Sequence, residues 1–240
     1  MPNIIVVLAI ALQGISAPGT LPPEAAAKLH ASLKSAAAHK HHVWRDTPPF
    51  DLSRRSSPPD SRAEADGVLV NAYIEIPLGG RQKFELDMAK NAPAIDRLIP
   101  EKIGGYPVNY GIVPQTVSYD GDPFDVLVLG PPIDGGRVVR GVIVGVMRMQ
   151  DEKGLDSKVV ISRTGPDRRP LHALTAEEQQ RIGDYFRRYK AHEEGKFSKV
   201  PGWGSVAEGL SYVTTTHTFF VSCRVAAESS CTLPTTPSTR

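Results

Sequence analysis

A cluster of aspartates directly before an apolar run constrains this chain more than any other feature of its sequence. Residues 118–125 (SYDGDPFD) lead into residues 126–129 (VLVL). The glycine and proline favour a tight turn, and the apolar run favours a buried strand. The three carboxylates between residues 120 and 125 repel one another unless a cation lies among them. Hard divalent cations that prefer oxygen ligands, Mg²⁺ above all, meet that need.

The calcium loop of an EF-hand is excluded for this segment. Counted from Asp120, the fifth position of such a loop would hold Phe124, and the sixth, which requires glycine, would hold Asp125. A surface turn with solvated aspartates is the simpler alternative for the segment taken alone. The motifs in the rest of the chain favour the metal site.

The composition of the chain excludes several classes of protein. With 240 residues, 40% of them hydrophobic, it can bury one substantial core with a smaller appendage. A formal net charge of +2, without a basic block beside aromatic residues, excludes a typical nucleic-acid binder. Two cysteines, Cys223 and Cys231, make neither a disulfide framework nor a zinc site, and whether they pair stays open.

The N-terminal residues allow two interpretations. Residues 4–12 (IIVVLAIAL) form an apolar run that is too short for a helix spanning a bilayer, so no stable membrane insertion is expected. The run is similar to the core of a signal peptide, but neither Lys nor Arg precedes it. Residues 1–17 are therefore either a cleaved export signal or an uncleaved hydrophobic extension.

Three further regions are expected along the chain. Residues 18–66 are predicted to form an N-terminal extension and linker, residues 67–224 the main domain, and residues 225–240 a C-terminal tail. In the extension, Pro22 and Pro23 favour the start of a helix, which apolar residues then follow at helical spacing. These residues are Ala25, Leu29, Leu33 and Ala36. The three histidines between residues 39 and 42 are predicted to form a solvated basic patch.

The main domain begins with predicted strands. Residues 70–76 alternate as a strand, Gly79 and Gly80 allow a reversal, and residues 83–86 return. This hairpin is expected to present Glu75, Lys83 and Glu85 on one face. The apolar run 138–149 contains Gly141 and Gly145, which is typical of a strand that bends sharply, as small closed barrels require.

A further helix is predicted to begin just after Thr175. Thr175 and Glu178 form a capping box, and Gly195 is expected to mark the end of the helix. Its apolar stripe consists of Ile182, Tyr185, Phe186 and Tyr189. Residues 206–224 fit a helix and a strand equally well.

Seven motifs, in order between residues 68 and 203, resemble those of the soluble, Mg²⁺-dependent inorganic pyrophosphatases of family I. They are Ile74–Pro77, Lys83 with Glu85, Asp96 with Arg97, Tyr106–Gly111, Asp120-x-Asp122-Pro123-x-Asp125, Asp151 with Asp156 and Lys158, and Tyr189 with Lys190. The resemblance implies a mainly β fold: a small closed OB-like β-barrel flanked by two or more α-helices. It also implies a homo-oligomer and, unless residues 1–17 are an export signal, a cytoplasmic protein.

The resemblance also implies the roles of the acidic residues. Asp120, Asp125 and Asp156 would hold metal ions, with Asp125 bridging two of them, and Asp151 would bind an ion that arrives with the substrate. Asp122 would accept the proton of the attacking water. Because none of these residues precedes Asp66, we expect the chain to stay active without the extension.

The remaining site residues are implied in the same way. Lys83, Arg97 and Lys190 would clamp phosphate oxygens, and Tyr110 and Tyr189 would donate hydrogen bonds to the substrate. Four residues would support the site: Glu75, Glu85, Lys158 and Tyr106. Each of them also has a simpler interpretation, as a solvated strand residue, an ion-pair partner or a packing residue.

The implied activity is hydrolysis of pyrophosphate to two phosphates by Mg²⁺-activated water. Three alternatives stay open. They are a non-catalytic interaction module on the same barrel, an OB-like binder of single-stranded nucleic acid, and a phosphohydrolase with a broader substrate range. The nucleic-acid binder would need a basic, aromatic groove, whereas the charges expected here are mostly acidic.

Overall fold

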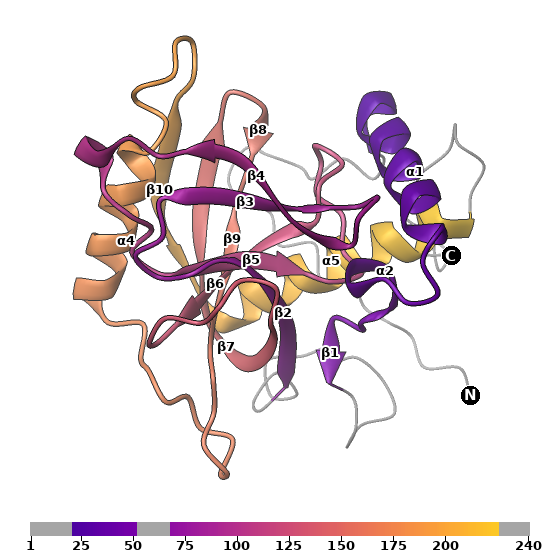
Figure 1. Ribbon diagram of the computed structural model, residues 1–240. Helices are drawn as coiled ribbons and strands as arrows, with labels where there is room; N and C mark the ends of the chain where they lie inside the picture. Colours follow the sequence, from indigo (N-terminus) through magenta and orange to yellow (C-terminus); the bar gives the residue numbers. More distant parts are fainter. Residues whose placement is uncertain (1–20, 52–67, 226–240) are drawn as a thin grey trace, which may run out of the picture.

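The computed structural model describes residues 21–51 and 68–225 of the chain (Figure 1). The predictions for residues 1–17, for much of the linker and for the C-terminal tail fall outside these residues. No helix among the described residues is long and apolar enough to cross a membrane.

Five strands close into a ring at the centre of the molecule. They are β2 (Leu69–Ile76), β5 (Asn109–Val113), β6 (Phe124–Leu129), β9 (Lys158–Ser162) and β7 (Val138–Asp151). They pair in the order β2–β5–β6–β9–β7, and β7 pairs back with β2. Every pair in the ring is antiparallel except β6–β9, which is parallel. The prediction of a mainly β fold around a small closed barrel is confirmed.

Strand β7 pairs with four other strands along its length, one of which is the short strand β8 (Gly154–Leu155) at its end. Its first part pairs with β2, its middle with β9, and its end with β10 (Ser198–Gly204). The register shifts between Ile143 and Gly145, where the predicted bend lies. At Gly141 a Cβ atom would lie 2.3 Å from the Ser162 carbonyl oxygen, so the close approach of the strands requires glycine there.

The predicted hairpin between residues 70–76 and 83–86 is wrong. Strand β3 (Gln82–Asp87) instead pairs with β4 (Ala92–Leu98), and the two form a separate two-stranded sheet beside the barrel. The return at Gly79 does occur, but β2 already has β5 and β7 as partners and offers β3 no free edge. Three short elements remain. The strands β1 (Phe50–Asp51) and β8 (Gly154–Leu155) belong to the large sheet, and η1 (Glu101–Ile103) is a 3₁₀-helix.

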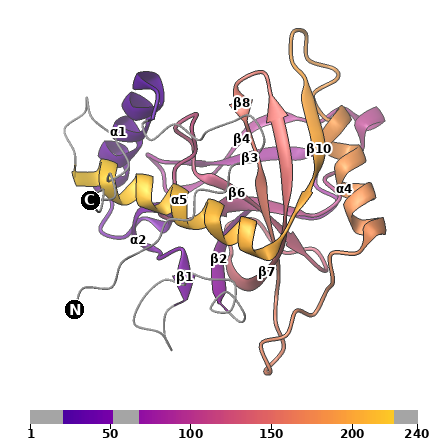
Figure 2. The ribbon, with the colours of Figure 1, turned by 180° about the vertical axis from the view of Figure 1, so that it is seen from behind.

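Two helices flank the barrel at different places. Figure 2 shows α5 (Val206–Val225) lying along the barrel, with α4 (Ala176–Arg188) beside β10. Residues 206–224, whose sequence fitted both a helix and a strand, are therefore helical. The predicted stripe on α4 is buried, and the Thr175 hydroxyl caps the helix by accepting the Glu178 N–H at 3.2 Å.

The expected end of α4 at Gly195 is wrong by seven residues. The helix ends at Arg188, and turns follow in which the Ala191 N–H donates to the Arg188 carbonyl and the Glu193 N–H donates to the Lys190 carbonyl. Gly195 lies in a later turn with a φ of +73°. Ending the helix early lets Lys190 point back toward the barrel.

The extension is packed onto the barrel domain through α1 (Pro23–Ala37) and α2 (Val43–Asp46). Together with α5 they build a hydrophobic cluster of their own, which includes Leu21, Ala25, Leu29, Trp44, Phe219 and Phe220. The predicted helix is confirmed, with Pro23 in its first turn. The ring of Trp44 meets Phe220 edge-on, at a centroid distance of 5.2 Å. Residues 21–51 are therefore anchored by burial of apolar surface.

The predicted solvated histidine patch is only partly correct. His42 is fully buried, and its Nε2 lies 3.1 Å from the Met88 carbonyl oxygen. Burial lowers the pKa of the His42 imidazole below its usual value. His41 stays exposed. The correction follows from α2, which begins at Val43 and turns His42 inward between the extension and the loop after β3.

The packing of α1 predicts a substantial cost for truncating its buried leucine. Leu29→Ala should lower the free energy of unfolding by about 2–5 kcal/mol, because Leu29 is fully buried. Leu33→Ala, the same change at a partly buried position of the helix, should cost clearly less. Urea unfolding of the two variants checks this. Equal losses at both positions would contradict the packing described here.

Candidate active site

The barrel brings the predicted aspartates to one region from separate strands. Asp120 and Asp122 lie in the turn before β6, and Asp125 is the second residue of that strand. Asp151 ends β7, and Asp156 lies between β8 and β9. We call these five residues the carboxylate cluster. The parallel pairing of β6 with β9 aligns Val126 with Val159, which sets Asp125 beside Lys158.

A buried lysine joins two members of the carboxylate cluster. The Lys158 Nζ donates to Asp125 Oδ2 at 2.6 Å and to Asp156 Oδ1 at 2.8 Å, and its side chain is only 1% exposed. Burial alone would lower the pKa of the Lys158 ammonium, but the two carboxylates outweigh it and raise that pKa above the usual value. Lys158 is therefore a charged, structural member of the site, as the ion-pair interpretation expected.

The cluster holds two carboxylates that ionise reluctantly. Burial raises the pKa of Asp156 to about 7, with Asp125 adding to the rise and Lys158 opposing it. Burial likewise raises the pKa of Asp122 to about 6, and the charge of Asp120 adds to that rise. Such shifts are the electrostatic cost of crowding anions away from water.

A second lysine approaches the cluster from the end of α4. The Lys190 Nζ donates to Asp151 Oδ2 at 2.6 Å and to Glu152 Oε1 at 3.1 Å. Although burial opposes the effect, Lys190 lowers the pKa of Asp151 below its usual value. Glu152 was not among the predicted site residues, although its position beside Asp151 is the one signal that could have indicated it.

The two-stranded sheet contributes a cationic pair. In its register Lys83 of β3 lies opposite Arg97 of β4. Both side chains contact Asp96 Oδ2, each at 3.0 Å, and Lys83 also donates to Glu85. Arg97 Nη2 lies 3.4 Å from Glu193 Oε1, a contact that reasoning from the sequence missed. The Nε of Arg97 is buried and has no hydrogen-bond partner among the described residues.

Glu75 does not lie on a solvated strand face, which was the simpler interpretation of its position. It is buried, and its Oε1 accepts the Leu86 N–H at 2.7 Å, which ties β2 to β3 where no ladder joins them. Burial raises the pKa of the Glu75 carboxyl well above its usual value, and the charge of Asp125 adds to this.

Aromatic residues form one wall of the site. Tyr106 packs against Tyr110 at a centroid distance of 5.4 Å, and Tyr189 stacks on Tyr185 at 6.1 Å. Burial, together with the carboxylates Asp125 and Asp156, raises the pKa of Tyr110 and of Tyr189. Both phenols therefore stay protonated and can donate hydrogen bonds, while Tyr106 and Tyr185 are buried packing residues.

An unexpected residue reaches the cluster from the extension. The Lys28 Nζ of α1 donates to Asp122 Oδ2 at 2.6 Å. The two residues are 94 positions apart, so no local pattern in the sequence could have indicated this contact. All the predicted site residues follow Asp66, and Lys28 adds a contact from the extension that was not predicted.

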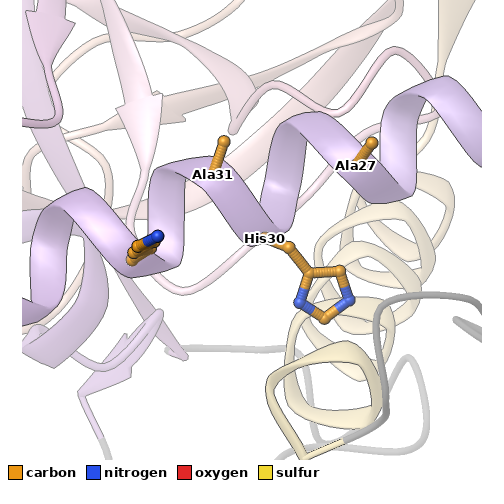
Figure 3. A pocket seen from close by; sticks show the side chains of 4 residues that line it. Ala27, His30 and Ala31 are labelled. Carbon is orange, nitrogen blue, oxygen red and sulfur yellow. The ribbon is translucent and has the colours of Figure 1, made fainter.

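The donor chemistry of the cluster fits a hard cation. Its donors are carboxylate oxygens, and burial together with neighbouring anions raises the pKa of two of its members. Within the described ranges, no three acidic, histidine or cysteine residues converge as a complete metal site, and lysines pair with several of the carboxylates. A shallow hollow elsewhere, on α1, is lined by Ala27, His30, Ala31 and Lys34 and has no carboxylate (Figure 3).

Removing the buried ammonium should destabilise the protein strongly. In excess chelator, Lys158→Met should lower the free energy of unfolding by about 3–5 kcal/mol, because two partly buried carboxylates lose the buried ammonium that pairs with both of them. Lys153→Met is the matched control, because its Nζ is exposed and 4.0 Å from Asp120, and should cost less than about 1 kcal/mol.

The penalty for Lys158→Met should also depend on pH. Because the pKa of Asp156 is raised, the folded state holds a proton there that the unfolded state releases above pH 4. At pH 5 Asp156 is protonated and needs no cation, whereas at pH 8 it is charged. Unfolding by urea at both pH values should therefore show the larger loss at pH 8. A penalty that is the same at both would contradict the assigned pairing.

Comparisons with known proteins show which family the chain belongs to. Residues 72–220 match the family model for inorganic pyrophosphatase. The inorganic pyrophosphatase of Xanthomonas axonopodis pv. citri (strain 306) is 40% identical over 153 residues, which cover 60% of this chain and 85% of that protein. The solved inorganic pyrophosphatase of Coxiella burnetii is similar with a TM-score of 0.59 and 35% identity, over 63% of this chain and 95% of that one. The structure of the Thermus thermophilus inorganic pyrophosphatase gives a TM-score of 0.59 at 34% identity, over 69% and 97%. Because the family model spans well over half of the sequence, the chain belongs to the inorganic pyrophosphatase family.

Proposed function

We propose that the chain hydrolyses inorganic pyrophosphate to two phosphates in a Mg²⁺-dependent reaction at the carboxylate cluster. The observation that carries the proposal is that carboxylates and cationic side chains gather at one site. Lys190 contacts Asp151 of the carboxylate cluster directly. Lys83 and Asp125 both act electrostatically on Glu75, and Arg97 and Asp156 both act on Tyr189, so these cations lie near the cluster. A small, highly charged anion with bound cations requires both sets.

The metal-holding role falls to four members of the carboxylate cluster. Asp120, Asp125 and Asp156 would hold Mg²⁺, with Asp125 shared between ions, and Asp151 would take an ion that accompanies the substrate. Bound there, Mg²⁺ supplies charge neutralisation and lowers the pKa of the attacking water. The pairing of Asp125 and Asp156 with Lys158 keeps them in place before any ion arrives.

Asp122 is proposed as the general base. It lies in the turn beside Asp120, and its backbone N–H donates to Asp120 Oδ1 at 3.1 Å. Its pKa, raised to about 6, places its proton affinity closer to neutral pH than that of an ordinary aspartate. A base near that value both ionises at pH 7 and accepts a proton effectively.

The cationic and phenolic side chains are proposed to hold the substrate. Lys83, Arg97 and Lys190 would bind phosphate oxygens, exchanging their present carboxylate partners for the anion. Arg97, whose Nε has no partner among the described residues, can contribute more than one N–H. Tyr110 and Tyr189, protonated as argued above, would donate to the departing phosphate. Glu75 and Glu85 would orient the loop and the lysine that they contact.

Two alternative functions and the oligomeric state are distinguished as follows. A non-catalytic module would have lost carboxylates, whereas all five members of the cluster are present in the sequence. A broader phosphohydrolase would accept nucleotides. Self-association, implied by the resemblance, stays a prediction that light scattering checks.

Activity should depend strictly on a divalent cation. Excess chelator should abolish phosphate release from pyrophosphate, and added Mg²⁺ should restore it, because the carboxylates cannot neutralise an anionic substrate alone. ATP in place of pyrophosphate is the control and should give far slower release. Full turnover in chelator would overturn the metal-dependent reaction, and equal rates on ATP would favour the broader enzyme.

Two substitutions should separate metal holding from proton handling. Asp125→Asn removes a charge shared between ions, so it should lower Mg²⁺ affinity and rate together. Asp122→Asn should retain more of the Mg²⁺ affinity while lowering the rate by roughly two to four orders of magnitude. Calorimetric titration of Mg²⁺, together with rates over a range of Mg²⁺ concentrations, provides the test. Full recovery of Asp122→Asn at high Mg²⁺ would make Asp122 a mere ligand.

A further inference from the structure

The segment that leads into the catalytic aspartates is held from outside by the N-terminal extension. We call residues 115–122 the aspartate loop and residues 21–51 the brace. The Trp44 Nε1–H donates to the Thr116 carbonyl at 3.0 Å, and the Gln115 N–H donates to the Trp44 carbonyl at 2.8 Å. The Gln115 side chain donates to the Arg45 carbonyl. The start of the aspartate loop is thus bonded to the brace through backbone and side chain.

The other end of the aspartate loop lies directly beneath α1. Gly121 has a φ of +83°, and a Cβ atom at this position would lie 2.7 Å from the Ala25 carbonyl oxygen and 3.1 Å from the Lys28 Cβ. The helix cannot shift away easily, because Ala25 and Leu29 belong to the buried cluster that also contains Val117 and Phe219. The helix and the tip of the loop are therefore in fixed contact.

This contact places the Lys28 ammonium beside one carboxylate oxygen of Asp122, the proposed general base. Two hydrogen bonds fix the main chain of Asp122. Its carbonyl oxygen accepts the Ser118 N–H at 2.7 Å, and its own N–H donates to the side-chain Oδ1 of Asp120. The Lys28 ammonium occupies Oδ2. Among the described residues, no hydrogen bond is made to Oδ1, which is left to accept from a water.

The ion pair contributes little to stability by itself. Both side chains are nearly half exposed, at 46% and 45%, and pairs of that kind are worth about 0–1 kcal/mol. Its effect is instead on orientation, because it fixes which carboxylate oxygen faces the reacting atoms. The match to the family model begins at residue 72, so the brace lies before the part of the chain that the model describes.

We propose that Lys28 is a positioning residue, which the brace holds against Asp122 so that one carboxylate oxygen is aimed at the attacking water. The proposal rests on the proposed function, since it assigns Asp122 the role of base. It also refines the expectation that the chain stays active without its extension, because the shortened chain should then work at a lower rate.

The test compares three lysine variants in the full chain at saturating Mg²⁺. Lys28→Met should lower kcat roughly tenfold while KM for pyrophosphate changes less than about twofold, because Asp122 contacts the water and not the substrate. Lys28→Arg, which restores a cation, should recover most of the rate. Lys34→Met removes an exposed lysine from the same helix and should behave like the unaltered chain.

A double-mutant cycle distinguishes positioning from a general loss of structure. In an Asp122→Asn background, Lys28→Met should cause no further loss, because its effect passes through the Asp122 carboxylate. A readout independent of turnover is amide hydrogen exchange of the aspartate loop in the metal-free protein. Lys28→Met should speed exchange at residues 118–122 and leave β9 unchanged.

The outcomes separate the two hypotheses. If the unaltered chain releases no phosphate from pyrophosphate, the proposed function fails, whatever the variants do. If it is active, an unchanged rate in Lys28→Met overturns the positioning role, as does an equal loss on top of Asp122→Asn. A faster Lys28→Met enzyme also overturns it and makes the contact inhibitory.

Discussion

A single buried ammonium holds the catalytic side of this barrel together. Lys158 lies between Asp125 and Asp156, which come from different strands, and it joins them at 2.6 and 2.8 Å. Without it, two carboxylates that crowd each other would have to ionise away from water. The ring of strands, the register of β6 with β9, and the approach of α4 all serve to place this group. The cations beside it then face a set of anions that is already in position.

The molecule places its charges in two layers around that ammonium. The inner layer consists of carboxylates on strands, whose positions follow from the barrel. The outer layer consists of lysines and an arginine on elements added to the barrel: the β3–β4 sheet, the turn after α4, and α1. Because Lys83 and Arg97 are only partly buried, they can exchange a carboxylate for a phosphate at modest cost, whereas Lys190 is buried beside Asp151. Rigid anions and exchangeable cations are what a small anionic substrate needs.

What could be predicted from the sequence follows local physics. The strand at 126–129, the bend near Gly145, the cap at Thr175 and the α1 helix each depend on neighbouring residues, and the structure confirms them. What failed depends on distant partners. Residues 83–86 have a strand pattern, but no pattern states that β4, and not β2, completes the pair. The burial of His42 and the contact of Lys28 with Asp122 likewise depend on how the extension lies against residues far along the chain.

The one parallel pair in the ring has a consequence for how the site comes into being. Strands β6 and β9 run side by side, so the chain between them must cross the barrel and lay down β7 before they can meet. Asp125 and Lys158 therefore meet only when β9, the last of the five ring strands along the chain, pairs with β6, and not within a local hairpin. Contacts so distant in sequence form slowly and together. A partly folded chain would hold scattered charges without an active site, so catalytic competence arrives all at once, with closure.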